Sequence, residues 1–149
     1  MATTSTFAVD ATNSAMYLTD TTVIYLTNSD IPIYALCALL NSDILDFRFH
    51  YLTKLKGGGV KEFFAKQVEK QPVPFNSENS GLTLELNQLG LAMSTALDEV
   101  SSTQIEKERQ LLKTEIIKLT SEINECVAKL FRISSDELKF IQETKASWT

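Results

Sequence analysis

The sequence predicts an α+β fold in which a small sheet with a buried helix is followed by a long C-terminal helical hairpin. Two segments rich in β-branched and aromatic residues, 21–27 and 60–68, supply the expected strands. An apolar run over 33–40 is the expected buried helix, and beyond residue 80 apolar residues recur at helical spacing. At 149 residues and 44% apolar composition, the chain suffices for one compact domain or a small domain with a helical extension.

The first strand and the first helix are separated by a turn. Thr21–Thr27 is predicted as a strand that ends at the turn residues 28–30. Pro32 suits the first turn of a helix, because its missing N–H needs no partner there. The eight apolar residues 33–40 then form a helix that is buried on nearly every side.

Ser42 is expected to cap a second helical segment over Asp43–Leu52. Its inner stripe is expected to carry Ile44, Phe47 and Tyr51. The carboxylates of Asp43 and Asp46 lie near the positive N-terminal end of this segment, so they are interpreted as helix-end electrostatics rather than as a nuclease metal site.

Three glycines, Gly57, Gly58 and Gly59, precede the second strand. Each costs about 0.5–1 kcal/mol relative to alanine, which is tolerated where positive φ or close backbone approach is needed. They do not form a phosphate-binding loop, because Val60-Lys61 follows in place of Gly-Lys-Ser/Thr. Pro72 and Pro74 force an extended exit toward a turn, and we place a boundary near residue 80.

Two long helices and a short final helix are predicted after the boundary. The long helices are expected to join near 101–103, with the packed seam of the second beginning near Leu111. Residues 134–137 form a capping-box sequence for the final helix. The first long stripe is Leu82, Leu86, Leu89, Met93, Leu97 and Val100, the second is Leu112, Ile116, Leu119, Ile123, Cys126 and Leu130, and the final helix points Leu138 and Ile141 inward.

Charge is distributed unevenly along the chain. Between Arg48 and Lys70 there are six basic and two acidic residues, a local balance of +4, whereas the remaining eight basic and seventeen acidic residues give −9. Such a polarised chain can present one basic face to DNA despite its net charge of −5. Cys37 and Cys126 are interpreted as small buried hydrophobes, and with His50 the only histidine a zinc site is disfavoured.

The stretch 34–74 resembles the core of the C-terminal specificity domain of Taq-type and type IIG adenine-N6 DNA methyltransferase restriction-modification enzymes. In that family an apolar helix with "ALLNS" is followed by "F-x-Y", a glycine pair, a basic-aromatic strand and "Q-x-P-x-P". The matching residues here are Ala38-Leu39-Leu40-Asn41-Ser42, Phe49-His50-Tyr51, Gly57-Gly58-Gly59, Lys61-Glu62-Phe63-Phe64-Ala65-Lys66-Gln67 and Gln71-Pro72-Val73-Pro74.

Residues 122–138 resemble the pattern "E-I-D-x-x-V-x-x-L-Y-x-L-x-x-E-E-I" that closes type IIG proteins. The chain departs from the family in three places. Asn124 replaces the usual Asp, Arg132-Ile133 replaces a glycine-containing turn, and Val60-Lys61 stands where an aromatic commonly follows the glycines. The resemblance implies that residues 1–80 are the C-terminal part of a DNA target recognition domain, and that 81–149 are a helical hairpin with a short terminal helix.

The implied function is sequence-specific recognition of double-stranded DNA for a methyltransferase or nuclease domain of the parent enzyme. Arg48 and the lysines could position the phosphates, Gln67 or Arg48 could read a base edge, and the glycines would let backbone N–H groups approach a phosphate. The predicted DNA-binding residues are Arg48, Lys54, Lys56, Gly57, Gly58, Gly59, Lys61, Lys66 and Gln67.

No catalysis, cofactor or metal is expected of this chain alone. Adenine methylation needs a glycine-bearing cofactor loop and an Asn/Asp-Pro-Pro-Tyr segment, and the three prolines here are never adjacent. We expect a cytoplasmic protein without a membrane span. Two alternatives stay open: a domain like the type I restriction specificity subunit, and a helical protein-interaction module without DNA binding, with self-association through the C-terminal helices.

Overall fold

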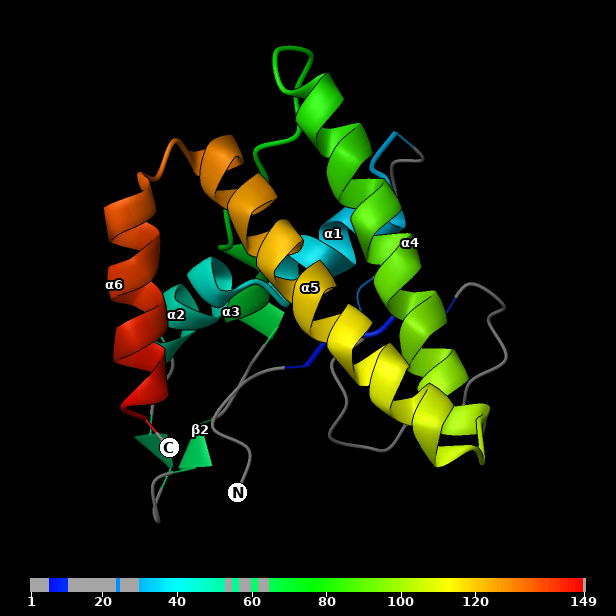
Figure 1. Ribbon diagram of the computed structural model, residues 1–149. Helices are drawn as coiled ribbons and strands as arrows, with labels where there is room; N and C mark the ends of the chain where they lie inside the picture. The colour runs from blue at the N-terminus through cyan, green and yellow to red at the C-terminus, as the bar shows by residue number, and fades with distance from the viewer. Residues whose placement is uncertain are drawn as a thin grey trace.

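The computed structural model describes residues 6–10, 24, 30–52, 55, 56, 60, 61 and 65–148, and it is mostly helical over this part of the chain (Figure 1). The predicted α+β class is therefore wrong. Among the described residues, in chain order, the elements are α1 (Ile33–Leu40), α2 (Asp43–Leu52), β1 (Leu55–Lys56), β2 (Val60–Lys61), α3 (Ala65–Glu69), α4 (Ser80–Ser102), α5 (Glu106–Phe131) and α6 (Ser135–Ala146).

The predicted strand over 60–68 is the main error. Only two residues of it are extended: β2 pairs antiparallel with β1, with Leu55 opposite Lys61 and Lys56 opposite Val60. Residues 65–69 form α3 instead, because Ala, Lys, Gln and Glu have high helix propensity and lose little side-chain freedom in a helix. The predicted strand Thr21–Thr27 lies outside the described residues apart from Ile24.

The two predicted helical segments after Pro32 are confirmed with their predicted bounds, as α1 and α2. Ser42 caps α2 as expected, because its Oγ accepts a hydrogen bond from the backbone N–H of Leu45 at 3.3 Å. The same hydroxyl donates to the carbonyl of Leu39 at 2.7 Å. One side chain therefore joins the end of α1 to the start of α2.

The predicted long helices are also confirmed, as α4 and α5. They are joined by residues 103–105 and run side by side in opposite directions across the molecule (Figure 1). The apolar stripe of α4 is buried at Leu86 and becomes exposed toward the connection, where Leu97 is 49% exposed. The stripe of α5 is half-buried at Leu112 and Ile116 and buried from Leu119 to Leu130, so its packed seam begins near Leu111 as predicted.

Helix α4 also packs against α1, and Gly90 sits at their closest approach. A Cβ at position 90 would lie 2.3 Å from the carbonyl oxygen of Tyr34. Only glycine allows the two backbones to approach this closely. This contact joins the first half of the chain to the hairpin.

Helix α6 begins with the predicted capping box, in which Glu137 N donates to Ser134 Oγ at 3.3 Å and Ser134 N donates to Glu137 Oε2 at 2.8 Å. One hydrophobic core takes residues from α1, α2, α4, α5 and α6. It therefore includes residues from both sides of the boundary expected near residue 80. The assignment of residues 1–80 to a recognition domain stays a prediction.

Candidate nucleic-acid interface

Helix α2 carries the first predicted DNA contact, and its buried face determines where that residue points. Leu45 and Phe49 are 1% and 0% exposed, and the Phe49 ring stacks on Phe7 with centroids 6.0 Å apart. The predicted inner stripe is therefore wrong at Tyr51, which is 66% exposed, because Leu45 and Phe49 occupy the centre of the buried face instead. Arg48 is exposed as the DNA-binding prediction requires.

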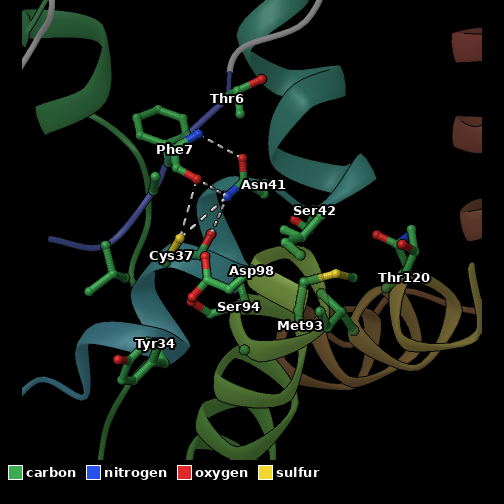
Figure 2. Close-up of a pocket in the computed structure, with 17 residues that line it drawn as sticks. Thr6, Phe7, Tyr34, Cys37, Asn41, Ser42, Met93, Ser94, Asp98 and Thr120 are labelled. Atoms are coloured by element: carbon green, nitrogen blue, oxygen red, sulfur yellow. Dashed lines mark hydrogen bonds between the residues drawn. The ribbon is translucent and has the colours of Figure 1, made fainter. Parts of the chain in front are cut away.

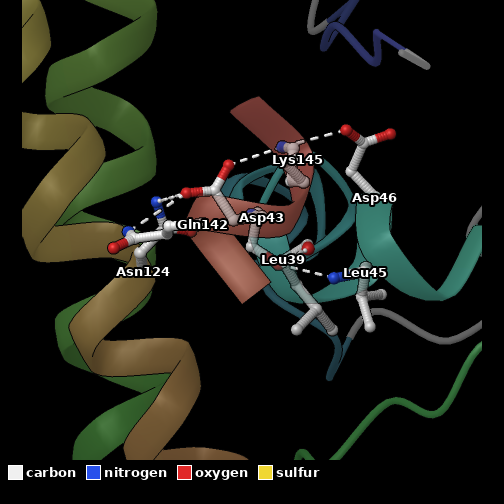
Figure 3. Close-up of polar contacts among 8 residues, drawn as sticks. Leu39, Asp43, Leu45, Asp46, Asn124, Gln142 and Lys145 are labelled. Carbon is white, nitrogen blue, oxygen red and sulfur yellow. Dashed lines mark hydrogen bonds and ion pairs between the residues drawn. The ribbon is translucent and has the colours of Figure 1, made fainter. Parts of the chain in front are cut away.

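A polar network holds the start of α2 against α5 and α6 (Figure 3). Asn124 of α5 accepts a hydrogen bond from Asp43 N at 2.8 Å and donates one to Asp43 Oδ2 at 2.6 Å. From α6, Lys145 Nζ lies 2.5 Å from Asp43 Oδ1 and 2.9 Å from Asp46 Oδ2. Gln142 adds a bond to Asp43 at 3.2 Å. The two aspartates therefore bind Lys145 of α6 and also place negative charge at the N-terminal end of their own helix.

The electrostatics of this network favour the charged lysine. Burial alone would lower the pKa of the Lys145 ammonium, but the hydrogen bonds and charges of Asp43 and Asp46 outweigh it and raise that pKa above its usual value. A sequence pattern gave no sign of this contact, because Asp43 and Lys145 are 102 residues apart. The network fixes α2, and with it the direction of Arg48.

The two-residue pairing of β1 with β2 brings the segments on either side of the glycines together. Lys56 and Lys61 occupy neighbouring backbone positions in this pair, since Lys56 is opposite Val60. Lys54 and Gly57, Gly58 and Gly59 lie outside the described residues. Only the backbone positions of Lys56 and Lys61 are therefore placed.

The last two predicted contacts lie on α3. Lys66 is exposed, whereas Gln67 is half-buried. The backbone carbonyl of Gln67 accepts a bond from Gln71 Nε2 at 2.8 Å. Its side-chain Oε1 is buried and has no hydrogen-bond partner among the described residues. An edge-reading role would need this half-buried amide to turn outward, so Arg48 is the better placed of the two candidates.

A cluster of aromatic rings beside Arg48 was missed by the sequence analysis. We call it the aromatic patch, and its members come from α2, α6 and the residues after α6. Ring centroids lie 3.6 Å apart for the His50–Trp148 pair, 5.0 Å for Phe47–Tyr51, 5.9 Å for Phe47–Trp148 and 6.4 Å for Phe47–Phe140. The available signal was the aromatic pair Phe47 and Tyr51 at i, i+4, which was assigned to the core. The patch consists of Phe47, His50, Tyr51, Phe140 and Trp148.

A separate cavity of about 450 Å³ lies between residues 6–9, α1, α4 and α5 (Figure 2). Asn41 holds its outer wall, because its amide accepts from Phe7 N at 2.9 Å and donates to Phe7 O at 2.8 Å. The lining is apolar with a few polar groups, among them Ser94 and Asp98. None of the predicted DNA-binding residues lines this cavity.

Both cysteines have a raised thiol pKa. Burial raises the pKa of Cys37, and a hydrogen bond with Asn41 partly offsets the rise. Burial and the nearby charge of Glu85 raise the pKa of Cys126 to about 11, against the opposing charge of Lys129. Cys126 is 1% exposed, as expected for a small buried hydrophobe, whereas Cys37 is half-buried. Neither thiol is activated as a nucleophile.

Within the described residues, no group of three or more His, Cys, Asp or Glu side chains is arranged to hold a metal ion. None of the helices described there combines the length and the apolar character that crossing a membrane requires. No protein-family model, no curated protein and no solved structure matches this chain.

Proposed function

We propose that this chain recognises DNA for a restriction-modification enzyme and is not itself catalytic. Methyl transfer or cleavage would belong to a separate domain of the parent enzyme, and the site of action would be the cytoplasm. The proposal rests on the two sequence resemblances and on the basic segment 48–70. Because the fold is mostly helical, the predicted sheet no longer supports the proposal. The proposal therefore depends on the sequence motifs and on the charge.

The single observation that carries the proposal is the local charge of +4 in a chain whose remainder has −9. Arg48 stands on the exposed side of a helix held by α5 and α6, and Lys56 and Lys61 occupy neighbouring backbone positions directly afterwards. Cations concentrated in one stretch of the chain would release counterions from the phosphates of a duplex, which is the main source of non-specific DNA affinity.

The test is a fluorescence-anisotropy titration of a labelled duplex at several salt concentrations. With about four phosphates contacted, the logarithm of the binding constant should fall against the logarithm of salt with a slope near −4. Lys56→Ala and Lys61→Ala should each reduce that slope by about 1. The matched control is Lys107→Ala, an exposed lysine of α5 outside the basic segment, which should leave the slope unchanged. Equal effects of all three variants, or no binding at low salt, would refute the proposal.

A second candidate, a helical protein-interaction module, is favoured by one observation. Leu84 of α4 and Ile117 of α5 are 59% and 71% exposed, so the outer sides of the two packed helices carry apolar side chains that a partner helix could cover. Light scattering distinguishes the candidates. Concentration-dependent self-association that Ile117→Ser abolishes, together with no DNA affinity, would favour the module. The type I specificity subunit is distinguished by counting recognition units in the parent gene, because that subunit carries two.

A further inference from the structure

The cavity shown in Figure 2 has an apolar inner end. Ala38 and Ile123 line it, and both are buried. Two buried polar side chains also line it, and both are already bonded. Ser42 Oγ bonds to the end of α1 and the start of α2, and Asn124 bonds to Asp43. The inner end of the cavity therefore suits an apolar group, because a polar group placed there would lose its hydrogen bonds to water.

The outer end of the cavity carries its single charge. Leu97 and Asp98 of α4 line the cavity and are exposed. Of the described residues that line it, Asp98 is the only charged one. Its carboxylate makes neither a hydrogen bond nor an ion pair within the part of the chain that the structure describes. An unpaired carboxylate at the edge of an apolar cavity attracts a cation, because the low-dielectric wall strengthens its field.

A hydroxyl group accompanies this carboxylate. Ser94 lies one turn before Asp98 on α4 and also lines the cavity, so the two side chains are neighbours on one side of the helix (Figure 2). A carboxylate and a hydroxyl can both accept hydrogen bonds from an ammonium group, which has up to three N–H donors. The polar side of the cavity therefore matches a positively charged donor rather than an anion.

We propose that this cavity binds a small molecule with an apolar body and one ammonium group. The body fills the inner end beside Ala38 and Ile123, and the ammonium group pairs with Asp98 and donates to Ser94 Oγ. The cavity volume of about 450 Å³ lies within the range of about 300–1,000 Å³ for ligand sites, which are also mostly apolar with a few placed polar groups. The inference does not depend on DNA binding, because no predicted DNA-binding residue lines the cavity.

The experiment compares three probes that share one apolar body and differ in charge: phenylbutylamine, phenylbutanol and phenylbutyrate. Each is titrated at neutral pH and low salt into the isotope-labelled full chain, and amide chemical shifts are followed by NMR. The backbone amide of Phe7 and the side-chain amide of Asn41 should report binding, because they bond to each other at the wall of the cavity. Phenylbutylamine should bind at least about threefold more tightly than phenylbutanol, and phenylbutyrate at least about threefold more weakly, as expected for one exposed charge.

Asp98→Asn tests the charge. The amide keeps the size of the side chain and loses the negative charge, so the three probes should bind this variant within about twofold of one another. Asp98 is exposed, so the variant should fold, and circular dichroism checks this. The matched control is Glu99→Gln, which removes the neighbouring exposed carboxylate of α4 that does not line the cavity. It should keep the preference for the amine.

Ser94→Phe tests the location, because the new ring would occupy the cavity. It should weaken binding of phenylbutanol and phenylbutylamine alike by at least about fivefold. The matched control is Thr95→Phe, which places the same ring at the next position of α4, where Thr95 is exposed and does not line the cavity. This control should bind the probes as the wild type does.

Three results would overturn the inference. The first is no saturable shift of the Phe7 and Asn41 signals with any probe up to about 10 mM, a concentration at which a ligand of this size should bind. The second is equal binding of all three probes to the wild type, or an amine preference that Asp98→Asn leaves unchanged. The third is binding that Ser94→Phe and Thr95→Phe weaken equally. Asp98→Asn decides the proposal even where Ser94→Phe fails to fold.

Discussion

Substitution of Asn124 by aspartate tests the network that positions α2. Asn124 is 2% exposed and makes a two-way contact with Asp43, accepting from its backbone N–H and donating to its carboxylate. A carboxylate in its place keeps the acceptor and loses the donor. Two like charges would then stand where Nδ2 and Oδ2 are now 2.6 Å apart.

The loss in the free energy of unfolding that this substitution causes has an upper limit. The introduced carboxyl can avoid repulsion by binding a proton, which would also restore the donor to Asp43. Protonating a carboxyl with an unfolded pKa of about 3.9 at pH 7 costs about 4 kcal/mol, so this is the upper limit. Because Lys145 compensates part of the repulsion, we expect a loss of about 2–4 kcal/mol in the free energy of unfolding at pH 7.

The pH dependence separates repulsion from a packing defect. The introduced carboxyl has a raised pKa in the folded state, so the folded state binds more protons than the unfolded one above pH of about 4. The deficit of the variant relative to the wild type should therefore grow as pH rises from about 4 to 7 and nearly vanish near pH 4. Urea unfolding followed by circular dichroism measures it at each pH.

Asn76→Asp is the control for this experiment. Asn76 Oδ1 only accepts a hydrogen bond, from Asn79 N at 3.0 Å, and a carboxylate can accept the same bond. This variant should be neutral or slightly stabilising, because it adds negative charge just before the N-terminus of α4. A loss for Asn124→Asp that does not vary with pH, or no loss at all, would refute the electrostatic account of the network.

Three further predictions concern the helices. Gly90→Ala should destabilise the chain by about 3 kcal/mol in urea unfolding, because the new Cβ would lie 2.3 Å from Tyr34 O, whereas Gly81→Ala meets nothing within 4 Å and should not destabilise it. Arg132→Gly should stabilise the chain by about 1 kcal/mol, because Arg132 has φ 57° and ψ 35°, and an unchanged midpoint would contradict this. The stability that Lys145 contributes should be fully present below its unfolded pKa of 10.5 and disappear as pH rises through its higher folded pKa. Unfolding followed by Trp148 fluorescence should show this loss of stability at alkaline pH, and the loss should be absent in Lys145→Met.

The helices could be predicted because their signals are local. Pro32 and Ser42 mark the starts of α1 and α2, the 3.6-residue period marks α4 and α5, and Ser134 opens the capping box of α6. The strand predicted over 60–68 is wrong because the aromatic residues Phe63 and Phe64 were given more weight than the helix formers of 65–69. Four helix formers and Val68 are enough for one turn of helix before Pro72.

The candidate site could be predicted only in part. Charge along the chain identified the basic segment, since it is a local property. The polar network and the aromatic patch join α2 to residues about 80–100 positions away, and no local pattern contains such contacts. Tyr51 is an example of a wrong prediction from local spacing. Its spacing from Ile44 and Phe47 predicts burial, but the chain buries the neighbouring face of α2 through Leu45 and Phe49.

The departures from the resembled family at the end of the chain concern packing rather than DNA contact. Asn124 replaces an expected aspartate, and a neutral amide suits the position opposite Asp43, since it both donates and accepts there without binding a proton. Arg132 replaces part of a glycine-containing turn and takes the left-handed conformation at the end of α5 that glycine adopts without strain. Both residues lie on the element that fixes α2 and α6. Changes at these positions should therefore alter stability, and the proposed DNA binding should keep its salt slope.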